Sequence, residues 1–445
     1  MTIEKHIFYS VCIISFAGSF LSTAVNIAIP VMSHEFGLTP DKLSWVVTAF
    51  LIPTAACLLP MGKVSDIYGR RKTYAAALLA FALTTAATAL ATTLPVLVAI
   101  RALQGIALSA VYVSYMPLLL ATTDEDRQGR ILGICVGLTY LGLSLGPVAG
   151  GLLTEYAGWR SIFLLSAAMA SAAYLFIRPV RQEWYANGAP FVNAVSSALS
   201  MAGIVLFLWG LSAYAETSLP LWAGLLLLLA FILHESRSYH PLLPLYIFRS
   251  VSFSMSNLAA FIQYSATYAM SFLLSLYLQV LTGLSPAVSG LILLVQPIIM
   301  ALLSPKAGAL SDAYGPMPIA TAGLALTTLG LACFAIWPDP SVAAVAAFLV
   351  LIGTGSALFG APNNSAIMSA VKPAYHGIAS SMLALARNLG QASSMAVVTL
   401  ILSQYTAATA IYADAVRAAL RQSYTLFAVL CLFSVFASLA RGKKK

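Results

Sequence analysis

Charged residues are scarce in this sequence. Only 8% of the 445 residues are Asp, Glu, Lys or Arg, whereas a soluble domain carries about 25%. The chain therefore lacks the polar surface that a water-soluble fold requires. Its formal net charge of +9 lies mostly in short connections between apolar runs. This distribution indicates membrane topology and not a nucleic-acid partner.

Motifs of catalysis and of metal binding are also missing. The five cysteines all lie in apolar runs and form no CxxC pair, so we interpret them as small buried hydrophobic residues. The chain has no HExxH, no GxSxG nucleophile elbow and no phosphate-binding loop, which are signatures of metal hydrolases, serine hydrolases and ATP-driven pumps. Its match to the GxSxG pattern, Gly142-Leu-Ser-Leu-Gly146, lies within an apolar run and not at a turn between a strand and a helix. We therefore expect a protein that is not an enzyme and that needs no metal or cofactor.

What the sequence has instead is a series of long hydrophobic runs. Because the bilayer core needs about 20 residues per helix, these runs predict an all-α polytopic membrane protein. They also predict contact with the lipid bilayer along the whole chain. We place fourteen helices near residues 8–29, 45–63, 73–91, 96–120, 131–152, 161–177, 191–213, 219–234, 253–280, 286–304, 317–336, 342–366, 378–403 and 422–440.

Basic residues predict the orientation of these helices. With the N-terminus inside, 17 of the 23 Lys and Arg residues fall in cytoplasmic segments and four fall outside. The remaining two lie within predicted helices. This bias follows the positive-inside rule and favours an even number of helices. We expect a multi-pass protein of the inner (cytoplasmic) membrane with both termini in the cytoplasm.

An internal repeat predicts the domain organisation. The motif Gly62-Lys-Val-Ser-Asp-Ile-Tyr-Gly69 reappears as Gly308-Ala-Leu-Ser-Asp-Ala-Tyr-Gly315. The copies follow the second and the tenth predicted helix, so they are eight helices apart and not six. We therefore predict two six-helix bundles, at 1–185 and 251–445, with two inserted helices and a cytoplasmic linker at 186–250. Repeats of this kind are typical of secondary transporters, whose substrate site lies between the repeats.

The helix at 96–120 contains a charged motif, Arg101-Ala-Leu-Gln104-Gly105. A charge within a span costs at least about 2.5–3.5 kcal/mol unless it is paired or hydrated, so it usually marks a functional site. The alternative is that Arg101 lies near the outer end of its helix and extends to water.

The helix at 131–152 carries small residues at a spacing of four. Such a row forms a groove for close helix packing, and a proline within it bends the helix. Generic packing of small residues is the alternative interpretation. The motif is Gly137-Leu-Thr-Tyr140-Leu-Gly142-Leu-Ser-Leu-Gly146-Pro147-Val-Ala-Gly150-Gly151.

With the ending Asn26-Ile-Ala-Ile-Pro30 of the first helix, these motifs resemble the major facilitator superfamily, specifically its fourteen-helix drug:proton antiporter branch. The resemblance covers essentially the whole chain. It associates the glycine motif with antiport and Arg101 with proton movement. It also implies a conformational latch on the cytoplasmic side, for which a plain basic loop is the alternative. The latch residues would be Gly62, Asp66, Gly69, Arg70 and Arg71, with a weaker second copy at Gly308, Asp312 and Gly315.

The sequence departs from that branch in its first helix. The branch usually carries an acidic residue there, and Leu21 takes its place. No Asp or Glu falls in the middle of any predicted helix, although a pump for cationic drugs normally needs a buried carboxylate. The interior polar residues are positive or neutral, and the tyrosines among them also suit simple packing. We predict a substrate and coupling site formed from Asn26, Arg101, Gln104, Tyr140, Gln263, Tyr264, Tyr268, Gln296, Arg387, Asn388 and Gln391.

These features favour a secondary active transporter that exports small organic compounds by alternating access, driven by a proton gradient. The alternative is an uptake or facilitated carrier for a specific neutral or anionic metabolite, such as a vitamin-like solute. A scaffold or receptor would leave the repeated latch motif and the intramembrane arginines without a purpose. We expect a monomer whose partners are a small-molecule substrate, lipid and protons.

Arg387 supplies the first test. It is either a structural donor to backbone carbonyls or a ligand of the substrate. If it is a ligand, Arg387→Ala weakens binding of an anionic substrate and Arg387→Lys keeps part of it, because a point charge only partly replaces the planar guanidinium. The dissociation constants of the three proteins measure this. Tight binding of lipophilic cations, unaffected by either change, would contradict it.

Overall fold

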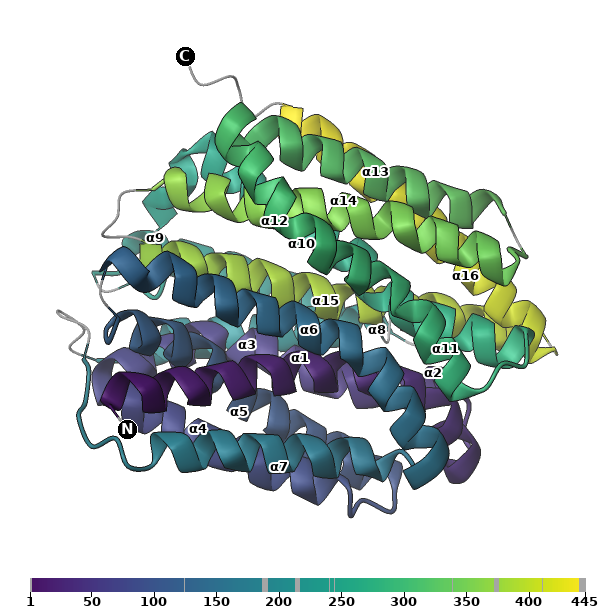
Figure 1. Cartoon of the computed structure of the whole chain (residues 1–445), viewed down its shortest axis with the longest axis horizontal. Coiled ribbons are helices and arrows are strands. Elements are labelled where there is room, and N and C mark those ends of the chain that lie inside the picture. The colour runs from purple at the N-terminus through teal and green to yellow at the C-terminus, as the bar shows by residue number, and fades with distance from the viewer. Residues whose placement is uncertain are drawn as a thin grey trace. The chain divides into compact units, whose positions relative to one another are not determined.

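The protein is built from helices (Figure 1), and no β-strand occurs in the part of the chain that the structure describes. A computed structural model describes residues 2–123, 125–185, 191–212, 217–239, 241–243, 245–337, 339–371, 376–409 and 411–439. The chain divides into two compact units, of which the first takes Met1–Gly210 and Thr217–Pro244 and the second takes Leu211–Glu216 and Leu245–Lys445.

The first unit contains a bundle of six long helices. A single short helix, α2 (Pro40–Leu43), precedes the second of them. The six are α1 (Ile3–Phe36), α3 (Trp45–Tyr68), α4 (Arg70–Thr88), α5 (Leu94–Leu120), α6 (Glu125–Ala157) and α7 (Arg160–Ile177).

The second unit contains the matching bundle. Its first helix is preceded by the 3₁₀ turn η1 (Leu245–Arg249) and is followed by one π-helical turn, η2 (Tyr277–Leu281). Its helices are α10 (Val251–Leu276), α11 (Pro286–Leu293), α12 (Val295–Tyr314), α13 (Pro316–Ile336), α14 (Val342–Ser369), α15 (His376–Ala408) and α16 (Tyr412–Leu439).

The two bundles repeat the same pairing of helices. In the first, α1 packs on α6 and α7, α3 packs on α5, and α4 packs on α5 and α7. In the second, α10 packs on α15 and α16, α12 packs on α14, and α13 packs on α14 and α16. Taking α11 and α12 as one span, each helix of the first bundle has a counterpart in the second. The predicted fold class, two six-helix bundles with two extra helices between them in the sequence, is confirmed.

The extra helices are α8 (Ala194–Ser212) and α9 (Leu219–Arg237), and they pack closely on one another. A Cβ atom added at Gly224 would lie 2.7 Å from the Cα atom of Phe207, so the two backbones nearly touch. Large apolar side chains such as Trp209 and Trp222 are exposed on the pair. Small residues at a crossing and apolar residues outside are what a lipid environment favours.

Helix lengths differ from the prediction in two instructive ways. The span predicted at 286–304 is present as Pro286–Ser304, but a turn at Leu294 divides it into α11 and α12. Pro297 has no N–H to donate to the carbonyl of Leu293, and the ladder is interrupted there. The repeated motif was predicted in a loop, but 62–68 forms the last turns of α3 and 308–314 the last turns of α12.

Both motif copies end on a glycine that makes the turn between two helices. Gly69 has φ 106° and Gly315 has φ 86°, in a region that only glycine adopts without strain. Among the described residues, eleven helices are individually long and apolar enough to cross a membrane by length and composition.

The close contact between α8 and α9 gives a prediction about stability. Gly224→Ala places a methyl group against the backbone of Phe207, which cannot rotate away, and overpacking of this kind costs about 1–3 kcal/mol. We expect a lower unfolding temperature of the purified protein. Gly137→Ala in α6 is the matched control, because an added Cβ meets no described atom within 4 Å. Equal unfolding temperatures in the two variants would contradict the close approach.

Candidate functional site

The glycine motif of α6 faces α1. A Cβ atom at Gly142 would lie 2.5 Å from the carbonyl oxygen of Phe16, and one at Gly150 would lie 2.8 Å from the Cα atom of Ala24. At Gly146 it would overlap the hydroxyl of Thr23. The predicted groove is therefore real, and it brings α6 onto α1 over three successive turns. Pro147 and Gly151 of the same motif are buried, and Tyr140 is partly exposed.

Arg101 lies inside the first bundle. Only 1% of it is exposed, so it does not extend to water at the end of its helix. Its Nε donates to the carbonyl of Val46 at 2.8 Å, and its Nη1 donates to the side chain of Gln104. Gln104 in turn donates to the hydroxyl of Thr85. The guanidinium also lies 4.2 Å from the ring centre of Phe50, where the face of the ring favours a cation.

This network joins three helices of the first bundle, since Val46 lies on α3, Thr85 on α4 and the Arg101–Gln104 pair on α5. The sequence predicted Arg101 and Gln104 as members of one site, and the structure shows that their side chains are in contact. Val46 and Thr85 were missed, because a backbone carbonyl and a single hydroxyl carry no sequence signal. Hydrogen bonds to the guanidinium offset much of the cost of burying its charge.

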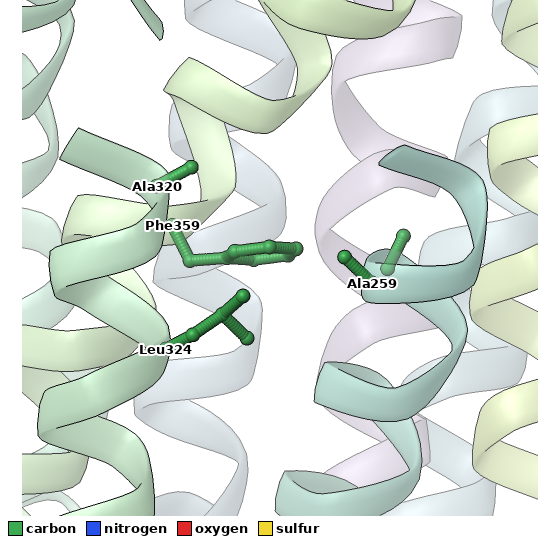
Figure 2. Packing of buried hydrophobic residues seen from close by; sticks show 5 residues of the cluster. Ala259, Ala320, Leu324 and Phe359 are labelled. Carbon is green, nitrogen blue, oxygen red and sulfur yellow. The ribbon is translucent and has the colours of Figure 1, made fainter. Parts of the chain in front are cut away.

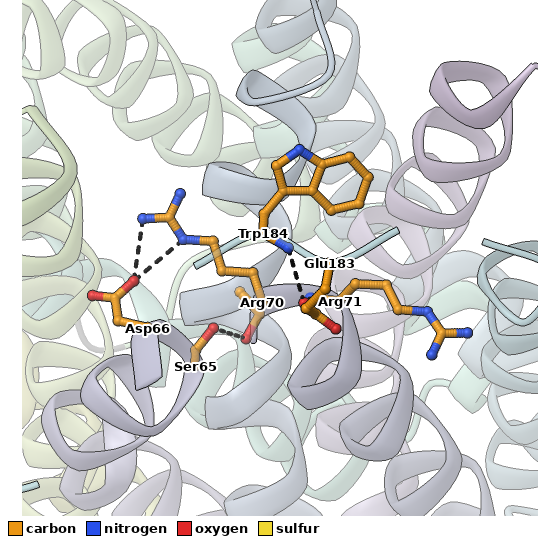
Figure 3. Close-up of polar contacts among 7 residues, drawn as sticks. Ser65, Asp66, Arg70, Arg71, Glu183 and Trp184 are labelled. Carbon is orange, nitrogen blue, oxygen red and sulfur yellow. Dashed lines mark hydrogen bonds and ion pairs between the residues drawn. The ribbon is translucent and has the colours of Figure 1, made fainter. Parts of the chain in front are cut away.

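The turn between α3 and α4 holds the first copy of the repeated motif (Figure 3). Asp66 accepts hydrogen bonds from Nε and Nη2 of Arg70 at 3.2 and 3.1 Å. Both side chains are partly exposed, so this pair alone adds little stability. The hydroxyl of Ser114 on α5 donates to that of Ser65, the residue directly before Asp66, at 2.9 Å and fixes α3 against α5.

The carboxylate at the N-terminus of α4 is Glu183 (Figure 3). Its two oxygens accept from the backbone N–H groups of Arg71 and Lys72 at 2.7 and 3.0 Å. A carboxylate there satisfies free N–H groups and meets the positive end of the helix dipole. The backbone N–H of Arg70 also donates to the carbonyl of Trp184 at 2.9 Å. The segment after α7 therefore caps the motif turn, a role that the sequence did not reveal.

The second copy is less completely defined. Gly308 lies in α12 and has no described atom within 4 Å of an added Cβ. The side chain of Asp312 lies outside what the structure describes. Pro316 follows Gly315 as the first residue of α13, a position where the missing N–H costs nothing.

In the second unit, the predicted residue Gln263 joins three helices. It lies on α10, is 3% exposed, and donates through Nε2 to the hydroxyls of Thr327 and Ser356 at 3.2 Å each. Thr327 lies on α13 and Ser356 on α14. These two partners were absent from the prediction.

The other predicted residues of this unit lie on α10, α12 and α15. Tyr264 packs against a small apolar cluster, and Tyr268 is buried. Asn388 is buried and donates to the carbonyl of Ala384 in its own helix at 2.7 Å. The remaining members are partly exposed, and they are Gln296, Arg387 and Gln391.

Two residues of α1 bear on the departure from the family pattern. Leu21, where an acidic residue was expected from the resemblance, is fully buried. Asn26 is fully buried as well, and its amide atoms have no hydrogen-bond partner among the described residues. A third residue, Glu235 in the last turn of α9, is a buried carboxylate that accepts from the N–H of Leu243 at 2.9 Å. The described residues contain no group of three or more His, Cys, Asp or Glu that could hold a metal ion.

Comparison with known proteins adds family information. A family model described as Major Facilitator Superfamily matches residues 11–257 and again residues 256–444. The chain is 28% identical over 438 residues to the riboflavin transporter RibZ of Clostridioides difficile (strain 630), covering 96% of this chain and 94% of that protein. It is 30% identical over 400 residues to the multidrug resistance protein Stp of Mycobacterium tuberculosis (strain CDC 1551 / Oshkosh), covering 86% and 73%.

A similar fold occurs among solved structures. The crystal structure of a peptide transporter POT in complex with sulfate matches with a TM-score of 0.71 and 14% sequence identity. The match covers 99% of this chain and 95% of that chain. At this identity the likeness concerns the fold alone.

Asp66 gives a test of the latch. Asp66→Asn replaces the carboxylate that accepts from Arg70 by a neutral amide of the same volume. We therefore expect transport to slow strongly while expression stays near normal. Initial transport rates in proteoliposomes, normalised to the amount of protein, measure this. Equal turnover in the variant and the wild type would show that the motif acts only as a topogenic signal.

Glu183 gives an independent test of the cap. Glu183→Ala leaves the N–H groups of Arg71 and Lys72 without their acceptor, and loss of a helix cap costs about 0.5–2 kcal/mol. We expect a lower unfolding temperature than for Arg181→Ala, which removes an exposed side chain of the same segment. If the two variants unfold at the same temperature, Glu183 does not stabilise the turn.

Proposed function

Because the chain belongs to the major facilitator superfamily, we propose that it is a secondary active transporter that exports small organic compounds by alternating access. The observation that best supports a transport function is the duplicated pairing of helices in two bundles. Repeated halves of this kind are typical of secondary transporters that work by alternating access. Gly69 and Gly315 end the motif copies in equivalent turns, which supports an equivalent mechanical role in both halves.

The packing of α6 on α1 favours export. The motif associated with antiport is not merely a set of scattered small residues, since its glycines at 142, 146 and 150 all meet α1. Such a seam keeps α1 and α6 moving as one element, because neither helix can shift by a fraction of a turn without a clash. The multidrug resistance relative also supports this direction of transport.

Further parts of the proposal follow from the resemblance and from the charges. We place the protein in the fourteen-helix drug:proton antiporter branch and, as a monomer, in the inner membrane. The bias of basic residues supports a cytoplasmic location of both termini. The bundles are proposed at 1–185 and 251–445, with the inserted pair and linker at 186–250. The substrate and coupling residues are those of the sequence prediction, and coupling is to protons.

A second candidate is uptake of one specific neutral or anionic metabolite. It is favoured by Leu21, which is buried where the branch carries an acid, and by the riboflavin transporter, which matches nearly end to end. Without an acid at that place, a proton would have to bind elsewhere, for example at Glu155, at a histidine, or on the substrate itself.

Membrane vesicles of opposite orientation separate the two candidates. We would measure accumulation of riboflavin, ethidium and fluorescein, which are neutral, cationic and anionic, with and without an imposed pH gradient. An exporter accumulates its substrate in inverted vesicles whose interior is acidic. Accumulation confined to right-side-out vesicles would replace export by uptake. Absence of transport for all three compounds in both orientations would contradict the proposed substrate range.

A further inference from the structure

The amide of Gln263 sits where α13 and α14 cross closely. A Cβ atom at Gly323 would lie 2.6 Å from the carbonyl oxygen of Gly355, and one at Gly355 would lie 2.5 Å from the hydroxyl of Thr327. The two glycines therefore let the helices approach and admit the side chain of Thr327 between them. Ser356, next to Gly355 in α14, joins Thr327 in accepting from Gln263.

Counting hydrogens fixes the orientation of this amide. Thr327 has one hydroxyl hydrogen, and it donates that hydrogen to the carbonyl of Gly323 at 3.1 Å. Towards Gln263 the Thr327 oxygen can therefore only accept, so the NH₂ end of the amide must face it. The second N–H of the amide is used by Ser356. Both donors of Gln263 are thereby committed.

The carbonyl end of the same amide has no donor. Gln263 Oε1 is buried and accepts no hydrogen bond from the described residues. A buried polar atom without a hydrogen-bond partner lowers the stability of the fold by about 1–3 kcal/mol. Water does not offset this cost, because the atom lies in the low-dielectric interior of the bundle. An acceptor that is held rigidly and left open suits a ligand that brings its own donor.

An apolar cluster lies one turn away from this acceptor (Figure 2). Figure 2 shows the ring of Phe359 projecting from α14 towards Ala259 of α10, beside Leu324 of α13. Each helix that contributes to the cluster also contributes to the polar network: Gln263 follows Ala259 by four residues, and Thr327 follows Leu324 by three. The interior of the second bundle thus places an aromatic ring about one turn from an oriented acceptor.

We infer that Gln263 Oε1 accepts a hydrogen bond from the transported compound, and that Thr327 and Ser356 are positioning residues that hold the amide for this purpose. The compound is a flat, largely apolar organic molecule that presents an N–H or O–H donor. This inference rests on the proposed function, and it names the substrate class. A site built to pair with a donor rejects an analogue that lacks one, because the buried carbonyl then stays unpaired.

Binding to the purified full-length protein in lipid nanodiscs tests the inference without requiring transport. The probes are two pairs that differ by one methyl group on the donor nitrogen: lumiflavin with 3-methyllumiflavin, and acridone with 10-methylacridone. In each pair the N–H group is the only donor, so the methylated partner has none. We expect each N–H compound to bind about tenfold more tightly than its methylated partner, which is 1.4 kcal/mol. Gln263→Leu should weaken the N–H compound and bring each ratio close to one.

Two further sets of variants separate positioning from stability. Gln279→Leu is the matched control, because Gln279 lies in η2, directly after α10, and donates to Ser275. The affinity ratios of this variant should stay near the wild-type values. Thr327→Val should reduce the ratios, whereas Thr327→Ser, which keeps the hydroxyl, should restore them. Unfolding temperatures identify any variant that fails to fold, and if Gln263→Leu is one, the two Thr327 variants decide.

Equal affinity for both members of each pair in the wild type would overturn the inference. So would a ratio unchanged by Gln263→Leu, or the absence of binding for all four compounds. If the proposed function is wrong, a different result is expected. The protein would still bind the N–H compounds selectively through Gln263, but vesicles would transport neither of them. Transport without selectivity for the donor would instead leave the proposed function standing and remove the inference.

Discussion

Close approach of helix backbones at glycine is the constraint on which the rest of the structure depends. In lipid there is no hydrophobic force between helices, so their association relies on contact area and on hydrogen bonds. On the first bundle, Gly146 admits Thr23 and so sets the spacing of α1 and α6. On the second, Gly355 admits Thr327 in the same way. Each contact brings a hydroxyl group into the interior. In the second bundle that hydroxyl, of Thr327, accepts from Gln263 and so becomes part of a polar network.

The two buried polar networks differ in how completely they are satisfied. Arg101 has a backbone carbonyl, an amide oxygen and an aromatic face for its charge. It therefore braces α3 against α5 inside one bundle, and this bracing is compatible with a role in coupling only if the network rearranges. The amide of Gln263 has both donors paired and its acceptor open. A satisfied network favours rigidity, whereas an open acceptor favours recognition of a ligand.

Much of the fold was predictable because the signals are long and repeated. Apolar runs locate the spans, and the two copies of the Gly62–Gly69 motif show that the bundle is duplicated. Helix ends were less predictable, because hydropathy reports the thickness of the bilayer core, whereas α3 and α12 continue beyond it to Gly69 and Gly315.

The site was predictable only in part. Arg101 and Gln263 are conspicuous in the sequence because charged side chains and amide side chains are rare in apolar runs. Thr327 and Ser356 do not, since single hydroxyls in such runs usually bond to their own helix. Glu183 was missed because it lies more than a hundred residues after the turn that it caps, and only the folded chain brings it back to Arg71.

The distribution of charge limits how a proton gradient can be used. The first helix carries Leu21 where a proton-binding acid is usual, and the only intrahelical charges that the sequence places deep in the spans are arginines. An arginine stays protonated at any physiological pH, so it cannot itself load and release a proton. It can attract an anion or respond to a charge that changes nearby. Coupling would therefore require either a carboxylate or a histidine near a helix end, of which buried Glu235 is one, or a substrate that carries the proton. In both cases the arginines would act by sensing charge and not by transferring it.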